Sequence, residues 1–300
     1  MTHAPVVPQD AAELKGAVRA HWEAEPCGTR DLPVEDRRQF FAELERERYE
    51  WEPYIHDFAR FEQGRGQQVL EIGVGAGSDF INWARNGANA TGIDLTDHGV
   101  GLTRERLALE GLHADVRRGD AEQLPFAADA FDMVYSWGVL HCAPDTPRAV
   151  REVHRVLRPG GKARVMIYYT YSWVGLMLWL LHCLAKGLPW KGPGWAMYHF
   201  LKSPGTKGYT RNQARELFCR IFRSQCAHAF ESRRPFTHAS CCQISERLPS
   251  FAMEVVSPLA GSATRTPLRS EFAYRSSEIA SAFLPRFPAK RARPLPVQGT

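Results

Sequence analysis

Two patterns of apolar residues alternate along the first 170 positions of the chain. Short runs rich in apolar residues, at residues 69–72 and 90–95, predict buried parallel strands. Apolar residues at helical spacing follow each run, over residues 80–84 and 98–110, and recur over residues 149–157. Strands and helices in alternation predict an α/β fold with a parallel sheet and helices on both faces.

The first strand ends at three glycines spaced two apart, Gly73, Gly75 and Gly77. Glycine adopts positive φ without steric cost, and its backbone can approach a ligand closely. The helix that follows presents free N–H groups and a positive dipole end, which favour an anionic group. A strand, a glycine turn and a helix make half of a nucleotide-binding unit, although a plain tight turn would have the same pattern.

The residues around the turn separate the classes of cofactor. A dinucleotide-binding motif would have glycine or alanine in place of Ser78. A phosphate-binding P-loop would end in Gly-Lys-Ser/Thr, which the chain does not contain. With Glu71 before the turn, the pattern E-x-G-x-G-x-G resembles the first motif of class I S-adenosylmethionine (SAM)-dependent methyltransferases.

Further motifs in the order of that family follow downstream. Residues 119–126 read G-D-A-E-Q-L-P-F, residues 131–141 read F-D-M-V-Y-S-W-G-V-L-H, and residues 157–161 read L-R-P-G-G. The resemblance implies that residues 131–134 and 162–169 are the fourth and fifth strands, and that residues 138–141 line the floor between cofactor and acceptor. A dehydrogenase is not expected to carry these segments, so an NAD(P)-dependent oxidoreductase is the less favoured alternative.

The resemblance also names cofactor-binding residues. Asp94 ends the second strand, where nucleotide-binding folds hold ribose hydroxyls, although an aspartate at that place can also cap the next helix. Leu95 would pack on adenine, and Asp120 with the following N–H group would contact its edge. The residues expected to bind SAM, or its product S-adenosylhomocysteine, are Glu71, Gly73, Gly75, Gly77, Asp94, Leu95, Asp120, Ala121 and Ser136.

The reaction needs positioning more than a strong base, because the methyl group of a sulfonium is already electrophilic. Holding two reactants in line supplies roughly 7–11 kcal/mol of a barrier. A base is needed mainly for a hydroxyl or carbon acceptor, and His141 is the candidate, with Tyr169 second. The alternative is that His141 only packs or binds backbone.

Two helical regions are candidates for covering the site. A helix over residues 11–21 and a longer one over residues 35–60, kinked or split at Pro53, precede the sheet. These two helices either pack as core or form a lid over the cofactor. A third region, the dense apolar run at residues 173–184, is too short to cross a bilayer. It suggests an apolar acceptor pocket or a membrane-surface contact. The lid and acceptor residues are Trp22, Tyr49, Tyr54, Tyr171 and Trp173.

The last third of the chain has a weaker pattern than the segments before it. A helix is expected over residues 210–222 with Thr210 as N-cap, then strands near residues 225–230 and 251–256. The irregular end is a divergent substrate cap, a disordered interaction tail, or a C-terminus altered by a change of reading frame. The predicted parts are a helical lid (1–66), a Rossmann-like core (67–171), an apolar cap (172–204), the rest of the core (205–260) and an irregular tail (261–300).

Composition restricts the partners. The net charge is +5, and the basic residues are scattered along the chain, which argues against a nucleic-acid interface. Seven cysteines show no zinc or C-x-x-C spacing, and no signal-peptide pattern is present, so no metal and a reducing cytoplasm are expected. Weaker likeness of residues 22–29 and 203–207 suggests the methyltransferase type 11 subgroup. The sequence predicts methyl transfer to an apolar or aromatic natural product, lipid or quinone-like acceptor; the alternative is a silent SAM-fold module that binds a partner. It leaves the acceptor atom and the oligomeric state open.

Overall fold

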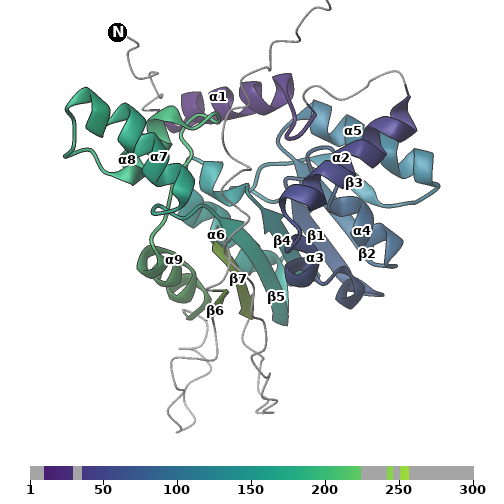
Figure 1. The fold of residues 1–300 in the computed structure, drawn as a ribbon. Helices are drawn as coiled ribbons and strands as arrows, with labels where there is room; N and C mark the ends of the chain where they lie inside the picture. Colours follow the sequence, from purple (N-terminus) through teal and green to yellow (C-terminus); the bar gives the residue numbers. More distant parts are fainter. Residues whose placement is uncertain (1–9, 30–35, 224–241, 246–250, 257–300) are drawn as a thin grey trace, which may run out of the picture. The chain divides into compact units, whose positions relative to one another are not determined.

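A seven-stranded sheet forms the centre of the protein (Figure 1). The computed structural model describes residues 10–29, 36–223, 242–245 and 251–256, all within one compact unit that extends to Thr266; the second unit, residues 267–300, lies outside them. The sheet order is β3-β2-β1-β4-β5-β7-β6. The strands are β1 (Gln68–Ile72), β2 (Asn89–Asp94), β3 (Asp115–Arg118), β4 (Phe131–Trp137), β5 (Leu157–Ile167), β6 (Cys242–Ser245) and β7 (Phe251–Val256).

The first five strands are parallel, and β7 runs antiparallel to both β5 and β6. The expected strand at residues 251–256 is confirmed as β7, and it pairs along β5 from Lys162 to Ile167. The strand expected at residues 225–230 lies outside the described residues, as do the predicted tail and the first nine residues. Residues 242–245 form β6, although no strand was predicted there. An edge strand this short carries too little periodicity to be recognised from the sequence.

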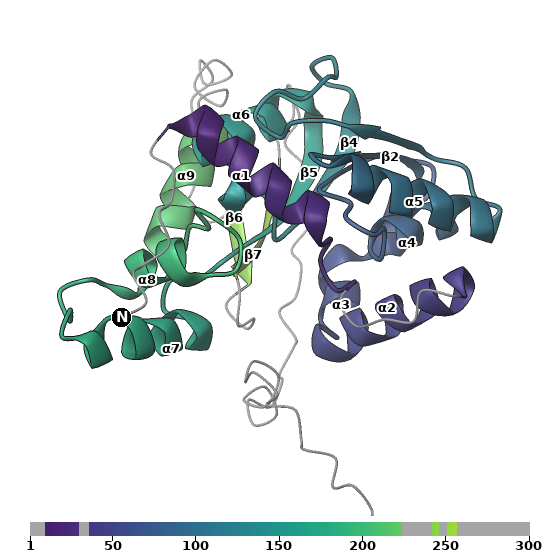
Figure 2. The ribbon, with the colours of Figure 1, turned by 90° about the horizontal axis from the view of Figure 1, so that it is seen from above.

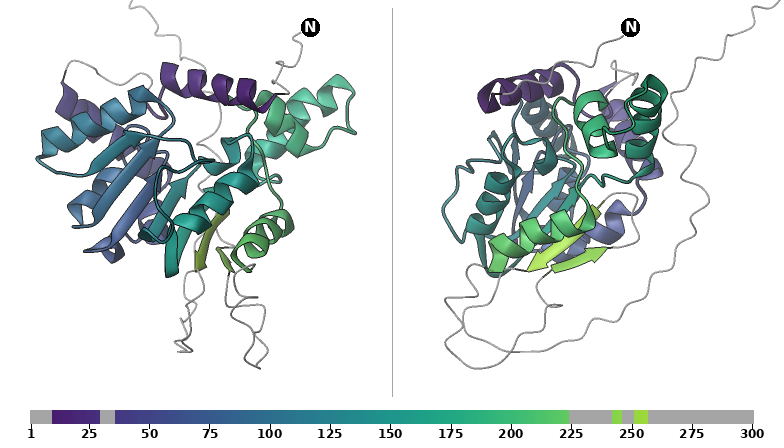
Figure 3. Two further views of the ribbon diagram at one scale, coloured as in Figure 1. Left: turned by 180° about the vertical axis from the view of Figure 1, so that it is seen from behind. Right: turned by 90° about the vertical axis from the view of Figure 1, so that its left-hand side faces the viewer.

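Helices cover both faces of the sheet, as predicted for this fold class. The teal α6 and green α9 lie in front of it in the left view of Figure 3, and their apolar residues share a core with β1, β4 and β5. On the other face α3, α4 and α5 pack against the same strands. The helices are α1 (Ala11–Ala24), α2 (Arg37–Trp51), α3 (Ile55–Ala59), α4 (Phe80–Arg85), α5 (Asp97–Glu110), α6 (Thr146–Val156), α7 (Trp173–His182), α8 (Pro193–Phe200) and α9 (Arg211–Arg223). The 3-10 turns are η1 (Phe61–Gly64), η2 (Leu140–Cys142) and η3 (Leu184–Lys186).

Local sequence explains most element ends. The split at Pro53 is confirmed, since α2 ends at Trp51 and α3 begins at Ile55. Gly111 ends α5 in a left-handed conformation. Thr210 precedes α9 and forms a capping box with Gln213. The Thr210 hydroxyl accepts from the Gln213 N–H, and the Gln213 side-chain oxygen accepts from the Thr210 N–H. The fifth strand begins earlier than residue 162, because β5 starts at Leu157 and a bulge absorbs the Pro-Gly-Gly segment.

Candidate active site

The glycine turn after β1 has the conformation that its sequence predicts. Gly73, Gly75 and Gly77 have φ of 83°, 53° and 79°, a region that favours glycine. A Cβ on Gly73 would clash with the Val139 side chain, so this glycine is needed for packing. In the part of the chain that the structure describes, nothing lies within 4 Å of a Cβ built on Gly75, so Gly75 borders open space. The turn therefore offers one glycine whose bare backbone a ligand can approach.

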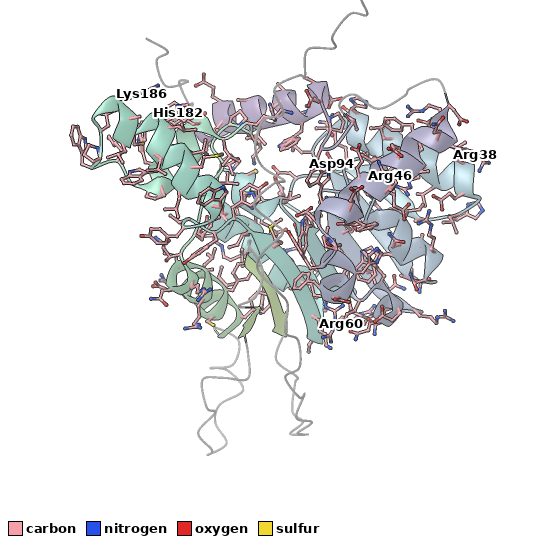
Figure 4. The ribbon with its side chains drawn as sticks, in the orientation of Figure 1. Arg38, Arg46, Arg60, Asp94, His182 and Lys186 are labelled. Atoms are coloured by element: carbon pink, nitrogen blue, oxygen red, sulfur yellow. The ribbon has the colours of Figure 1, made fainter. Side chains whose placement is uncertain are left out.

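The Asp94 carboxylate lies directly beside this turn. One of its oxygens accepts from the Gly75 N–H at 2.9 Å, and the other accepts from the Thr96 N–H at 2.9 Å and the Thr96 hydroxyl at 2.6 Å. Thr96, not Asp94, caps α5, so the helix-cap interpretation of Asp94 is wrong. Figure 4 labels Asp94 at the end of β2 below α1. The Asp94 side chain thus joins the first two predicted cofactor segments, beside the backbone hydrogen bonds that Gly73 and Val74 donate to the Ile93 carbonyl.

Helix α1 crosses the edge at which the parallel strands end (Figure 2). Lys15 binds Asp120 at 2.7 Å and Glu122 at 2.6 Å, both in the loop after β3. Burial lowers the pKa of Lys15, but its hydrogen bonds with the two carboxylates outweigh burial and raise it. At the other end of α1, the Glu23 carboxylate accepts the N–H groups that open α5, at 2.9 Å each. The role of Lys15 was not predicted; the two acids of the G-D-A-E motif, which need a cationic partner, were the available clue.

The apolar side of α1 faces Leu95, the residue that is predicted to pack on adenine. Leu14, Val18 and Trp22 form a cluster with Leu95 and Cys142. Trp22 and Leu95 are therefore brought together, whereas Ala121 packs against the core on the α6 side. The apolar residues under α1 and the ion pairs at its ends make it the element that covers this edge.

Helix α2 reaches the glycine turn through a buried ion pair that sequence analysis did not foresee. Arg48 binds Asp79 with two hydrogen bonds of 2.8 and 2.6 Å, and the Tyr135 hydroxyl donates to Asp79 at 2.9 Å. Burial raises the pKa of Asp79, but Arg48 lowers it below its ordinary value. Tyr49 donates to the Ser78 carbonyl at 2.9 Å, so this predicted lid residue anchors the turn. Arg48 lies one helical turn after Leu44, a buried apolar residue of α2, and an arginine at such a position was the overlooked sign of a buried pair.

His141 follows β4 and is fully buried. Its ring lies 4.2 Å from the ring of Tyr168, and neither nitrogen has a hydrogen-bond partner among the described residues. Burial, and then the charge of Lys207, lowers the pKa of His141 to about 3. The Lys207 N–H donates to the His141 carbonyl at 3.2 Å, which brings the 203–207 segment to this loop. His141 is therefore neutral at physiological pH and a weaker base than an ordinary histidine.

A second candidate base, Glu52, was missed because it follows the last turn of α2, where no periodicity marks it. Its carboxylate accepts from the Trp137 indole N–H at 3.3 Å and the Tyr54 hydroxyl at 3.4 Å. Arg48 lies 3.3 Å away. Burial raises the pKa of Glu52 above its ordinary value, in spite of these partners. Glu52 is thus a half-buried carboxylate at the end of β4.

The remaining predicted residues lie at different depths. Ser136 is fully buried and donates to the Ile72 carbonyl at 3.2 Å, which ties β4 to β1. Glu71 is buried beside Asp79, and burial together with that carboxylate raises its pKa. Tyr169 pairs with the backbone of Tyr209. Tyr171 and Trp173 are more than half exposed, outside the cluster around Asp94.

Part of the described site lies in a segment that matches a known family model. Residues 70–165 match the model of a methyltransferase domain. Phthiotriol/phenolphthiotriol dimycocerosates methyltransferase of Mycobacterium leprae (strain TN) is 44% identical over 98 residues, which are 32% of this chain and 36% of that protein. The protein of that name in Mycobacterium tuberculosis (strain ATCC 25177 / H37Ra) is 42% identical over 109 residues, 36% of this chain and 37% of that one.

These matches cover about a third of the length of the curated relatives. A solved SAM-dependent methyltransferase from Methanosarcina mazei is 19% identical, covers 69% of this chain and 98% of its own, and has a TM-score of 0.47. The matched residues contain the end of β1, the glycine turn, β2, β3 and β4, together with Asp94 and Asp120. Residues 70–165 thus match a methyltransferase domain, and the sheet that contains them has the Rossmann-like order of class I methyltransferases.

Proposed function

We propose that the protein transfers a methyl group from SAM to a small apolar acceptor. The observation that carries the proposal is the open space at Gly75 beside the Asp94 carboxylate, within the matched methyltransferase domain. Bound SAM would supply an electrophilic methyl group. Asp94 would hold the ribose hydroxyls, while Leu95, Asp120 and Ala121 would hold adenine. Helix α1 would exclude water from above.

An apolar acceptor is supported by the chemistry of the cap and of the relatives. Residues 173–184 are almost entirely apolar, and the cap (172–204) follows β5 at the edge of the site. The matched mycobacterial proteins are named for lipid substrates. On these grounds we propose residues 172–204 as the acceptor cap, and we propose residues 1–66 as the lid because α1 covers the edge of the site.

Methyl transfer from labelled SAM to apolar hydroxyl and aromatic compounds tests the proposal. We expect label in at least one lipid-like acceptor and none in a charged, water-soluble one. Saturable SAM binding without transfer to any acceptor would instead favour a silent module that binds a partner.

Within the proposed reaction, Glu52 is the better base for a hydroxyl acceptor. We expect Glu52→Gln to lower kcat about 10²-fold or more, because it removes a carboxylate of raised pKa. Glu50→Gln, an exposed neighbour on α2, serves as control. His141→Asn should cost less than about tenfold, since a buried imidazole of low pKa accepts a proton poorly.

The pH dependence distinguishes these two residues. A base must be deprotonated, so kcat should fall as pH drops through the pKa of Glu52, which lies above 4.5. His141, with its pKa near 3, should add no limb between pH 5 and 8. Loss of transfer in His141→Asn with full transfer in Glu52→Gln would reverse the assignment.

A further inference from the structure

The hairpin of α7, η3 and α8 (residues 173–200) exposes large apolar side chains. The two helices pack against each other and lie side by side in Figures 1 and 3. At the far end of the hairpin, Trp190 is 71% exposed, Leu181 56% and Leu184 46%. Single exposed apolar residues are normal, but several within residues 180–190 mark an interaction surface.

The charge of this part of the chain has one sign. From residue 153 to residue 215 the sequence contains no aspartate and no glutamate. Lys186 lies over the Phe200 ring at 5.6 Å and Lys191 over the Trp195 ring at 5.1 Å, so two ammonium groups border the apolar end. Figure 4 labels Lys186 and His182 at the outer end of the hairpin. Such a surface complements a negatively charged one.

The length of α7 determines how this surface could contact a membrane. Helix α7 has 10 residues, or about 15 Å at 1.5 Å per residue, which is half the hydrocarbon thickness of a bilayer. Within the described ranges, no helix is long and apolar enough to cross a membrane. Tryptophan and leucine beside lysine are typical of elements that lie in the lipid interface.

We propose that the outer end of the α7–α8 hairpin docks on the surface of an anionic lipid bilayer. Leu181, Leu184 and Trp190 would enter the interface, and Lys186 and Lys191 would contact acidic headgroups. The chain runs from the end of β5 at Ile167 directly into this hairpin, so docking would bring the membrane next to the site. That last step, the delivery of an apolar acceptor, rests on the proposed function; the docking itself does not.

Flotation of the full chain with lipid vesicles tests the docking. We expect binding to vesicles of phosphatidylcholine with phosphatidylglycerol, weaker binding to phosphatidylcholine alone, and a decrease with salt. Replacing Lys186 and Lys191 by glutamine should lower the partition coefficient about 25-fold, at about fivefold per lysine. Leu181→Glu with Trp190→Glu should lower it at least about tenfold.

Trp51→Glu is the matched control, because Trp51 is 46% exposed at the end of α2, away from the hairpin. It should bind vesicles like the unmodified chain. The circular dichroism spectrum and SAM affinity of the hairpin variants show whether they remain folded. No vesicle binding by the unmodified chain, or equal binding by the hairpin variants, would overturn the proposal. A dimer that these variants convert to a monomer, without vesicle binding, would identify a second copy as the occupant. Vesicle binding without SAM binding would overturn only the proposed function.

Discussion

Gly75→Ala is expected to weaken SAM binding about a hundredfold, or roughly 3 kcal/mol, while the protein stays folded. Gly75 has a φ of 53° and borders open space, so an added methyl group would occupy the approach to the bare backbone. The strain of a left-handed alanine costs only about 1–2 kcal/mol of stability. Calorimetric titration with SAM measures the affinity, and urea unfolding measures the stability.

Gly66→Ala separates backbone strain from loss of the site. Gly66 has a φ of 71° and also faces open space, but it lies in the turn before β1. It should lose similar stability and no SAM affinity. Gly73→Ala, by contrast, should unfold or severely destabilise the protein, because its methyl group would clash with Val139. If Gly75→Ala bound SAM as tightly as the unmodified chain, the cofactor would not approach this turn.

Arg48→Leu is expected to lower the free energy of unfolding by about 3–5 kcal/mol. The change leaves Asp79, which is 4% exposed, without the guanidinium that it binds at 2.6 and 2.8 Å. Urea unfolding at neutral pH measures the effect. Arg46→Leu on the same helix is the control; its pairs with Glu43 and Glu50 are exposed, so its loss should change the free energy of unfolding far less than the loss of Arg48.

Two further measurements identify the ion pair as the cause. Adding Asp79→Asn to Arg48→Leu should recover part of the lost stability, because no buried charge is then left unpaired. The folded pKa of Asp79 lies below its ordinary value, so the pair stabilises the fold above the unfolded pKa and is lost as pH falls through the folded one. The difference between Arg48→Leu and the unmodified chain should therefore shrink in acid. A constant difference would contradict the assignment.

The sequence predicted the parts of the site that depend on neighbouring residues. The positive φ of Gly73, Gly75 and Gly77 follows from residue type, and the place of Asp94 follows from a strand that ends at an acid. Motif order then predicted the parallel sheet, and a further strand was expected at the residues that form β7. These features need no knowledge of distant contacts.

The contacts between α1, α2 and the sheet could not be predicted, because they join residues far apart along the chain. Lys15 meets Asp120 across 105 positions, and Arg48 meets Asp79 across 31. Hydrophobic periodicity does not specify which acid a cation will meet. His141 shows the same limit, since its residue type suggested a base and only its burial reveals the low pKa.

Titration of SAM into the purified full-length chain tests the central claim most directly. We predict saturable binding at one site per chain, with S-adenosylhomocysteine bound at the same site and SAM affinity markedly reduced in Asp94→Ala. The Asp94 carboxylate holds Gly75 and Thr96 in place, so its loss would disturb the turn as well as the ribose contact. A folded chain that binds neither compound, or an Asp94→Ala variant of unchanged affinity, would contradict this account.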